Sequence, residues 1–251
     1  KNKASLVVVN KIQKKLKIHN QIKVKNTLKF LTDISGIFRK NINTKIIAIT
    51  GSCGKTSLKE LLGNTLKKIS KVSISPRSFN NKYGVPLSLF NLNYADNYGV
   101  LEVGMDKKGE IDNLSKIIKP NVSVITNINY AHAKNFNNIK SIALAKSEII
   151  YNTRPKGYIV LNADDRFFKL HKTIAFKKNL KVISFGINDQ KSNICLKNIN
   201  RNGKNFLIKI KHDNLKKYFL ISNNFQSNIY NILGAIAVIS IYFDISKLNK
   251  N

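Results

Sequence analysis

The 251-residue chain is 43% hydrophobic, enough for one large or two small domains with a sizeable core. Its two cysteines, Cys53 and Cys195, are far apart in sequence, which excludes a disulfide framework or a zinc pattern and suits a reducing cytosol. The longest apolar run, 232–243, is too short to span a bilayer. The net charge of +31 indicates either a protein that binds nucleic acid or anionic membranes, or a composition skewed throughout towards Lys, Asn and Ile. The lysines are scattered, which favours the second interpretation. Under either interpretation the charge would attract anionic substrates.

The first 43 residues are predicted to end one structural unit. Apolar runs at 6–9 and 22–24 indicate strands, and an amphipathic helix is expected over 28–38. The chain starts with Lys and no signal peptide is recognisable, so we expect a cytoplasmic protein and a fragment of a longer chain.

Residues 45–62 carry the strongest chemical signal. The run Ile46–Ile49 predicts a buried strand, Gly51 and Gly54 break it, and Lys55 and Thr56 open a segment with helical periodicity. A strand, a glycine turn, Lys-Thr and a helix form the layout of a phosphate-binding loop, because backbone N–H groups and the helix N-terminus together favour phosphate. The lysine would reach the β- and γ-phosphates, and the threonine hydroxyl would hold Mg²⁺.

The glycine spacing of this loop is irregular. The usual motif has a glycine five positions before the Gly of Gly-Lys, and here Ile49 stands there. An ordinary strand–helix turn that carries Gly-Lys-Thr is therefore the alternative. Under the nucleotide interpretation, the binding residues are Gly51, Ser52, Cys53, Gly54, Lys55, Thr56 and Ser57.

The next elements are predicted as a strand at 72–75, a polar loop over 78–86 and a helix over 87–92. Asn80 and Asn81 lie in that loop, which is either an Asn-rich turn or a functional segment. A buried strand follows at 98–103. Glu102 lies at its carboxyl end, where open α/β sheets bind ligands, so it is either a surface charge or a metal ligand.

A helix near 111–118 and a strand over 122–126 are predicted next. His132 follows that strand at the same expected edge and is either structural or a ligand. The helix over 139–151 contains Lys146, which is either a solvated residue or partly enclosed by a small-residue surface.

Further strands at 158–161 and 182–185 complete an alternation that predicts an α/β fold with a mostly parallel, doubly wound sheet. The alternating pattern over 193–221 predicts a small antiparallel β meander appended to this sheet. An apolar helix is expected over 228–243. Asn228 and Asn231 stand at its start, where asparagine is also common for structural reasons.

Seven segments occur in the order seen in Mur ligases: TGSCGKTS, FNNKYGVPLS, LEVG, TNINYAHAKNF, ALAKSEI, LNADD and NIYNILGA. Over about residues 45–245 the chain resembles the central ATP-binding domain of that family, which shares the irregular glycine spacing. The resemblance implies a central domain over 44–251. Residues 1–43 resemble the last part of the N-terminal UDP-sugar-binding domain, and the C-terminal domain is absent.

The resemblance also implies a mechanism. ATP phosphorylates a substrate carboxylate to an acyl phosphate, and an amine then displaces phosphate. Lys55 would hold the phosphates, and Thr56 and Glu102 the first Mg²⁺. His132 and Lys146, as a carbamate, would serve a second Mg²⁺. The remaining implied contacts are Asn80 and Asn81 to phosphate or acceptor, and Asn228 and Asn231 to the nucleotide.

The FNN loop and the AKSEI helix most resemble family members that join D-alanyl-D-alanine to UDP-N-acetylmuramoyl-tripeptide in peptidoglycan synthesis. The implied protein is a monomeric, ADP-forming ligase without nucleic-acid partners or membrane insertion, and the fragment alone would be inactive. A folylpolyglutamate synthase-like ligase and a basic nucleic-acid-binding P-loop protein are the alternatives.

Overall fold

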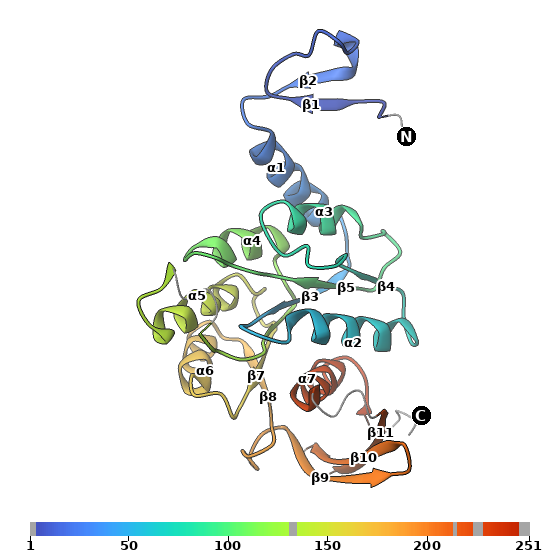
Figure 1. Cartoon of the computed structure of the whole chain (residues 1–251), viewed down its shortest axis with the longest axis vertical. Coiled ribbons are helices and arrows are strands. Elements are labelled where there is room, and N and C mark those ends of the chain that lie inside the picture. Colours follow the sequence, from blue (N-terminus) through green and yellow to red (C-terminus); the bar gives the residue numbers. More distant parts are fainter. Residues whose placement is uncertain (1–3, 131–134, 213–214, 223–227, 246–251) are drawn as a thin grey trace.

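The computed structural model describes residues 4–130, 135–212, 215–222 and 228–245. Its centre is a nine-stranded sheet in the order β11-β10-β9-β8-β7-β6-β3-β5-β4 (Figure 1). All neighbours from β4 to β9 pair in parallel, whereas β9, β10 and β11 pair antiparallel. The predicted α/β fold with an appended antiparallel meander is confirmed. The strands are β3 (Lys45–Thr50), β4 (Val72–Ile74), β5 (Tyr98–Glu102), β6 (Val122–Ile125), β7 (Tyr158–Asn162), β8 (Lys181–Gly186), β9 (Ile194–Asn202), β10 (Asn205–His212) and β11 (Leu215–Ser222).

Helices cover both faces of the sheet, as Figure 1 shows. The helices α2 (Lys55–Lys67) and α7 (Ile229–Ile239) lie on one face. The other face carries α3 (Gly84–Phe90), α4 (Glu110–Ile118), α5 (Ile139–Tyr151) and α6 (Phe168–Lys177). Among the described residues, no helix has the length and apolar character needed to cross a membrane.

Strand β3 shows why the sheet must be covered twice. Its side chains alternate: Ile46 and Ala48 join the core under α3–α6, whereas Ile47 and Ile49 join the core under α2 and α7. All four are fully buried. A continuous apolar strand of this kind is stable only between two helical layers, because successive side chains point to opposite faces.

The N-terminal segment extends away from the sheet (Figure 1). It consists of β1 (Val7–Val9), a short 3₁₀ turn (Ile18–Asn20), β2 (Gln21–Lys23) and α1 (Thr27–Lys40), and β1 and β2 pair in parallel. The strands and helix expected in the first 43 residues are thus confirmed.

A buried arginine anchors α1 to the sheet domain. Arg39 Nε donates to the carbonyl oxygen of Ile118 at 2.7 Å, and its Nη2 donates to that of Lys119 at 3.3 Å. The guanidinium therefore satisfies the carbonyls that end α4, which have no partner within the helix. Burial, followed by repulsion from Arg154, lowers the pKa of Arg39 to about 10.

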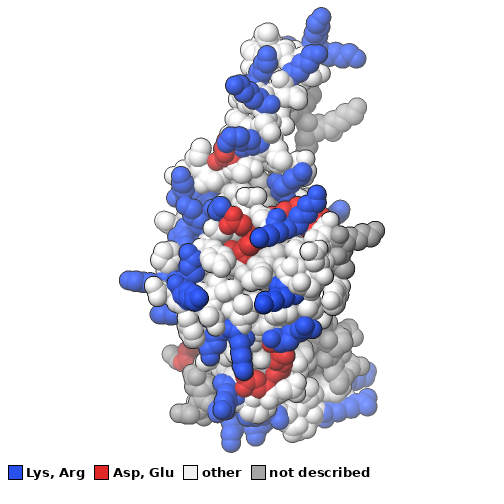
Figure 2. Space-filling view, turned by 90° about the vertical axis from the view of Figure 1, so that its left-hand side faces the viewer, with Lys and Arg blue, Asp and Glu red and all other residues white. Residues whose placement is uncertain are grey.

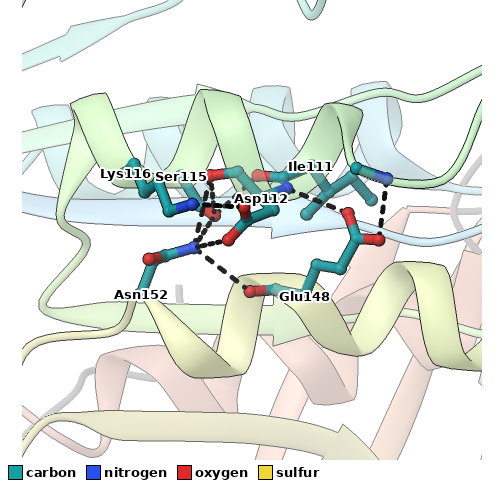
Figure 3. Close-up of polar contacts among 7 residues, drawn as sticks. Ile111, Asp112, Ser115, Lys116, Glu148 and Asn152 are labelled. Atoms are coloured by element: carbon teal, nitrogen blue, oxygen red, sulfur yellow. Dashed lines mark hydrogen bonds and ion pairs between the residues drawn. The ribbon is translucent and has the colours of Figure 1, made fainter.

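Helices α4 and α5 are joined by polar contacts rather than by apolar packing alone (Figure 3). Glu148 of α5 accepts the backbone N–H groups of Gly109 at 2.8 Å and Asp112 at 3.0 Å, at the N-terminal end of α4. One turn further, the Asn152 amide donates to the Asp112 carboxylate and the Ser115 hydroxyl, both at 2.9 Å. These contacts fix how α5 lies against α4.

Some predicted elements differ from those in the structure. The loop expected over 78–86 ends early, because α3 begins at Gly84 and finishes at Phe90 rather than spanning 87–92. Pro86 is compatible with this helix, since the first helical residues have no intrahelical N–H acceptor. Helix α6 has no counterpart among the predicted elements, and α7 ends at Ile239 instead of 243.

Candidate functional site

The phosphate-loop sequence lies at the carboxyl edge of the sheet. Strand β3 lies between β5 and β6, and two connections diverge here: the one after β3 runs through α2 on one face, and the one after β5 runs through α4 on the other. Ligands of open α/β sheets bind where the strand order diverges in this way. The loop after β3, the end of β5 and the segment after β6 therefore converge there, as the sequence predicts.

Two glycines of the loop are required by geometry. Gly51 has φ +147°, and a Cβ there would lie 1.8 Å from the Thr126 hydroxyl oxygen. Gly54 has φ +81°, and a Cβ there would lie 2.8 Å from Oδ1 of Asn231. Both positions combine a backbone conformation that favours glycine with a neighbour that leaves no room. The irregular glycine spacing thus has a structural reason in this chain.

The segment after β6 holds the loop from one side. The backbone N–H of Ser52 donates to the Asn127 carbonyl at 2.9 Å, and that of Cys53 donates to Asn127 Oδ1 at 3.0 Å. The Cys53 carbonyl accepts the Thr126 hydroxyl at 2.7 Å. These contacts involve the Cys53 backbone while its side chain is exposed. The amides left for an anion are those that open α2, which have no acceptor within their own helix.

Two lysines meet at one carbonyl oxygen. Lys55 Nζ and Lys146 Nζ each donate to the Gly51 carbonyl at 2.9 Å, the first from α2 and the second from α5. Lys146 is 1% exposed. Its position in the chain left open whether it was solvated or enclosed, and the structure encloses it.

The environment of Lys146 disfavours its charged form. Burial, followed by repulsion from the Lys55 ammonium group, lowers the pKa of Lys146 from 10.5 to about 7. A neutral amine is a nucleophile, whereas an ammonium group has no free electron pair. A substantial fraction of Lys146 is therefore in the reactive form near neutral pH.

Glu102 and Thr56 form a second pair beside the loop. The Thr56 hydroxyl donates to one carboxylate oxygen of Glu102 at 2.7 Å, and the Asn80 amide donates to the other at 2.7 Å. Glu102 as a whole is 2% exposed, and its backbone N–H donates to the Ser75 hydroxyl at 3.2 Å. Asn80 therefore fixes the orientation of Glu102.

These oxygen donors fit Mg²⁺. Magnesium takes hard oxygen ligands and is commonly bound by one or two carboxylates together with substrate phosphates. The Thr56 hydroxyl and Glu102 carboxylate offer this donor set at the N-terminus of α2. Within the described ranges no group of three or more His, Cys, Asp and Glu side chains could hold a metal alone.

A pocket of about 510 Å³ opens between the loop and the segment after β5. Lys55, Asn80 and Asn81 line one part of it, and Asp106 and Glu110 line another. The Asn81 side chain accepts the backbone N–H groups of Tyr83 at 3.1 Å and Gly84 at 3.0 Å, so it also shapes the start of α3.

The other predicted residues differ in their placement. Asn231 of α7 is 8% exposed and lies against Gly54, which brings α7 to the loop. Asn228 stands one position before α7, and Ser57 is exposed on α2. His132 lies outside the described residues.

Sequence reasoning missed the residues that hold the loop and the carboxylate. The sequence places Ser75 in a predicted strand and Asn127 directly after another, and its pattern predicts no role for either in the site. Thr126 and Asn127 stand directly after a buried strand at the ligand edge, and this position was the available signal. Their contacts with Cys53, 73 and 74 residues away, depend on tertiary structure.

Comparison with known proteins agrees with this geometry. The sequence matches the Mur ligase middle domain family over residues 49–239. The chain belongs to the Mur ligase family. The UDP-N-acetylmuramoyl-tripeptide–D-alanyl-D-alanine ligase of Buchnera aphidicola subsp. Baizongia pistaciae is 35% identical over 221 residues, which cover 87% of this chain and 47% of that protein. The chain thus spans about half the length of such Mur ligases.

Solved structures give the same assignment. MurF from Acinetobacter baumannii superposes with a TM-score of 0.85 at 28% identity, covering 95% of this chain and 52% of that one. The S73A mutant of L. casei FPGS superposes with a TM-score of 0.62 at 16% identity, covering 86% and 62%. The second likeness is one of fold alone, so the folylpolyglutamate synthase alternative is a distant relative.

Proposed function

We propose that this chain is the central, ATP-binding part of a ligase of peptidoglycan precursor synthesis. The whole enzyme joins D-alanyl-D-alanine to UDP-N-acetylmuramoyl-tripeptide and releases ADP and phosphate. The shared Gly51 contact of Lys55 and Lys146, beside the Thr56–Glu102 pair, carries the proposal. The 35% identity to a relative of that name supports the choice of substrates.

The reaction has two steps. A carboxylate oxygen of the tripeptide attacks the γ-phosphorus of ATP, which forms an acyl phosphate and ADP. The amine of D-alanyl-D-alanine then attacks the acyl carbon, forms the amide, releases phosphate and loses a proton. Phosphoryl transfer requires alignment and charge neutralisation more than covalent help from the protein.

The loop residues have distinct tasks in this scheme. Gly51 and Gly54 let the loop turn closely enough for the amides that open α2 to face the phosphates. The Lys55 ammonium group leaves the Gly51 and Ser52 carbonyls and balances charge on the β- and γ-phosphates. Asn231, which lies against Gly54, binds the base of the nucleotide.

Thr56 and Glu102 would hold Mg²⁺. The bound ion supplies neutralisation of phosphate charge. Asn80 keeps the carboxylate oriented through its 2.7 Å contact, and near-complete burial of Glu102 reduces competition from water. Asn80 and Asn81 border the 510 Å³ pocket, where we place the tripeptide carboxylate.

Lys146 acts as a carbamate in this proposal. Its neutral amine attacks CO₂, forms an N–C bond and releases one proton, so a buried neutral amine becomes an anionic carbamate. The lowered pKa and the enclosed position support this step. The carbamate, with His132, would serve a second Mg²⁺.

The rescue experiment separates this role from a structural one. In the ligase with its flanking domains, Lys146→Ala should be nearly inactive and should recover part of its activity with acetate or propionate. Full activity of the variant would remove Lys146 from the site. Inactivity without rescue would assign the lysine a cationic or structural role instead.

Calorimetry tests the proposed function of the chain as it stands. We expect weak binding of ATP·Mg²⁺, because flanking domains that would exclude water and complete the site are not part of it. With both peptide substrates present, phosphate release should stay near background. Absence of nucleotide binding would refute the site, and enzymatic ligation by the chain alone would refute the need for further domains.

A further inference from the structure

A second pocket, of about 340 Å³, lies at the edge of the sheet opposite the phosphate loop. It opens where β6 and β7 begin. The four residues of β6, roughly 13 Å of strand, separate this edge of the sheet from the edge that carries the phosphate loop. We call it the basic pocket. Its lining residues are Lys116, Lys119, Tyr151, Asn152, Thr153, Arg154, Pro155 and Lys178.

The lining of the basic pocket is strongly cationic. Four of its eight residues are Lys or Arg and none is acidic, whereas 44 of the 251 residues of the chain are Lys or Arg. The pocket beside the phosphate loop, by contrast, includes Asp106 and Glu110 in its lining. The enrichment is therefore local and does not follow from the composition of the chain alone.

Three of these cations are not neutralised by neighbouring carboxylates. Lys116 pairs with Asp112, but the side chains of Lys119 and Arg154 have no ion-pair partner among the described residues. The Lys178 ammonium group lies 5.5 Å from the centre of the Tyr151 ring. That ring face offers a weak attraction and leaves the ammonium group available to an anion.

Helix ends do not cancel this charge. The C-termini of α4, α5 and α6 meet at the pocket, and each carries about half a negative charge. The buried Arg39 guanidinium already binds the terminal carbonyls of α4. Three exposed cations thus outweigh the remaining partial charge. The positive charge of Arg154 also repels that of Arg39 and, after burial, helps to lower the pKa of Arg39.

The frame of the pocket is rigid. The Asn152 amide donates to Asp112 and Ser115, as Figure 3 shows, and the Thr153 hydroxyl donates to the Ile149 carbonyl at 2.9 Å. The backbone N–H of Arg154 donates to the Pro120 carbonyl at 2.8 Å. Because the backbone of the pocket is already fixed, an anion that binds there orders few further backbone groups, which keeps the entropy cost of binding low.

We propose that the basic pocket binds a phosphate-bearing anion of the size of a diphosphate. Its volume suits one or two phosphate groups, and a guanidinium flanked by lysines matches phosphate oxygens in charge and geometry. The site is separate from the nucleotide site, and the inference does not rest on the proposed ligase function.

The test titrates the 251-residue chain with pyrophosphate and follows backbone amide NMR shifts. Amides at 119 and 152–154 report on the basic pocket, and those at 51–57 report separately on the phosphate loop. We expect saturable shifts in the first group. The Arg154→Gln/Lys178→Gln variant should weaken that binding at least fivefold, and its thermal unfolding serves as the check on folding.

The matched control is Lys204→Gln/Lys216→Gln, which removes two exposed charges from the β meander. Its affinity should stay within twofold of the parent chain. Equal weakening by both variants would show a general charge effect, and shifts confined to 51–57 would show that only the loop binds; either result overturns the proposal. Sedimentation with phosphatidylglycerol vesicles then distinguishes a lipid headgroup from a soluble diphosphate as the source of the phosphate.

Discussion

At the scale of single residues, the site depends on two ammonium groups that share one acceptor. Lys55 and Lys146 both donate to the Gly51 carbonyl, and burial makes the second of them give up its proton more readily. Lys55 is half-buried and borders the open pocket, so it remains free to move onto a phosphate. The two lysines thus have different chemistry although they touch the same oxygen.

Lys55→Ala should abolish the nucleotide-dependent step. In the proposed mechanism this lysine is the cation that the loop directs at the transferred phosphoryl group, and such stabilisation is worth on the order of a hundredfold or more in rate. ADP release by the ligase with its flanking domains measures the loss. Lys67→Ala, at the far end of the same helix, is the control and should retain activity. A Lys55→Ala rate within a few-fold of the parent would show that the loop has been misread.

Lys146→Met should stabilise the fold while it removes function. The folded state lowers the pKa of this lysine, so between pH 7 and 10.5 the unfolded chain binds a proton that the folded chain lacks. The free energy of unfolding of the parent therefore rises with pH across this window. Near pH 7 the methionine variant should be more stable by a few kcal/mol, as an order of magnitude. Lys55 still donates to Gly51 in the variant.

Urea unfolding at pH 7, 8 and 9 measures this difference. The advantage of the variant should shrink as pH rises, because folding of the parent releases the Lys146 proton and this release costs less free energy at higher pH. A difference that is constant with pH would mean that Lys146 titrates normally. A less stable variant would mean that its contact with Gly51 outweighs the cost of burying the charge.

At the scale of elements, α4 and α5 are locked together by Glu148 (Figure 3). Glu148→Ala should cost about 1–2 kcal/mol, because the Gly109 and Asp112 N–H groups lose their acceptor. Burial raises the pKa of Glu148, so the charge itself contributes little. Glu148→Gln, which keeps one acceptor oxygen, should therefore cost less. Chemical unfolding compares the two, and equal losses would show that the charge matters.

The sequence predicts elements better than it predicts their contacts. Strand and helix periods identify β3, α2 and α5 correctly, because a buried strand or amphipathic helix leaves its own local pattern. Helix α6 is missed, since its buried face is short and includes a histidine, His171, which weakens the apolar pattern. The start of α3 is misplaced because Pro86, usually a helix breaker, is tolerated in a first turn.

The candidate site shows the same limit. Motif order brings Lys55, Thr56 and Glu102 to one sheet edge, and in the structure the Thr56 hydroxyl donates to the Glu102 carboxylate. That Asn80 holds Glu102, or that Lys146 reaches Gly51, depends on side-chain directions set by separate elements. No pattern within one segment contains this information.

At the scale of the whole molecule, the net charge is the dominant feature. With 44 Lys and Arg and 13 Asp and Glu, one-to-one pairing leaves 31 cations without a carboxylate. Figure 2 shows Lys and Arg spread across one face with acidic side chains between them. Spread charge attracts any polyanion weakly, whereas a nucleic-acid-binding surface concentrates it. A mobility shift assay with duplex DNA distinguishes the two, because a concentrated surface gives a steep dependence on salt.

Added salt should stabilise this protein. Like charges repel one another in the compact state, and raising NaCl from 50 to 500 mM shortens the screening length well below the 10 Å found at 0.1 M. Screening also weakens attractive pairs, but Lys29–Asp33 is largely exposed and Lys116–Asp112 is partly exposed, so both contribute little. The midpoint of thermal unfolding should therefore rise by several degrees. A midpoint that falls with NaCl would mean that attractive pairs outweigh the repulsion, and the surplus of 31 positive charges would then have to be neutralised locally in the folded chain.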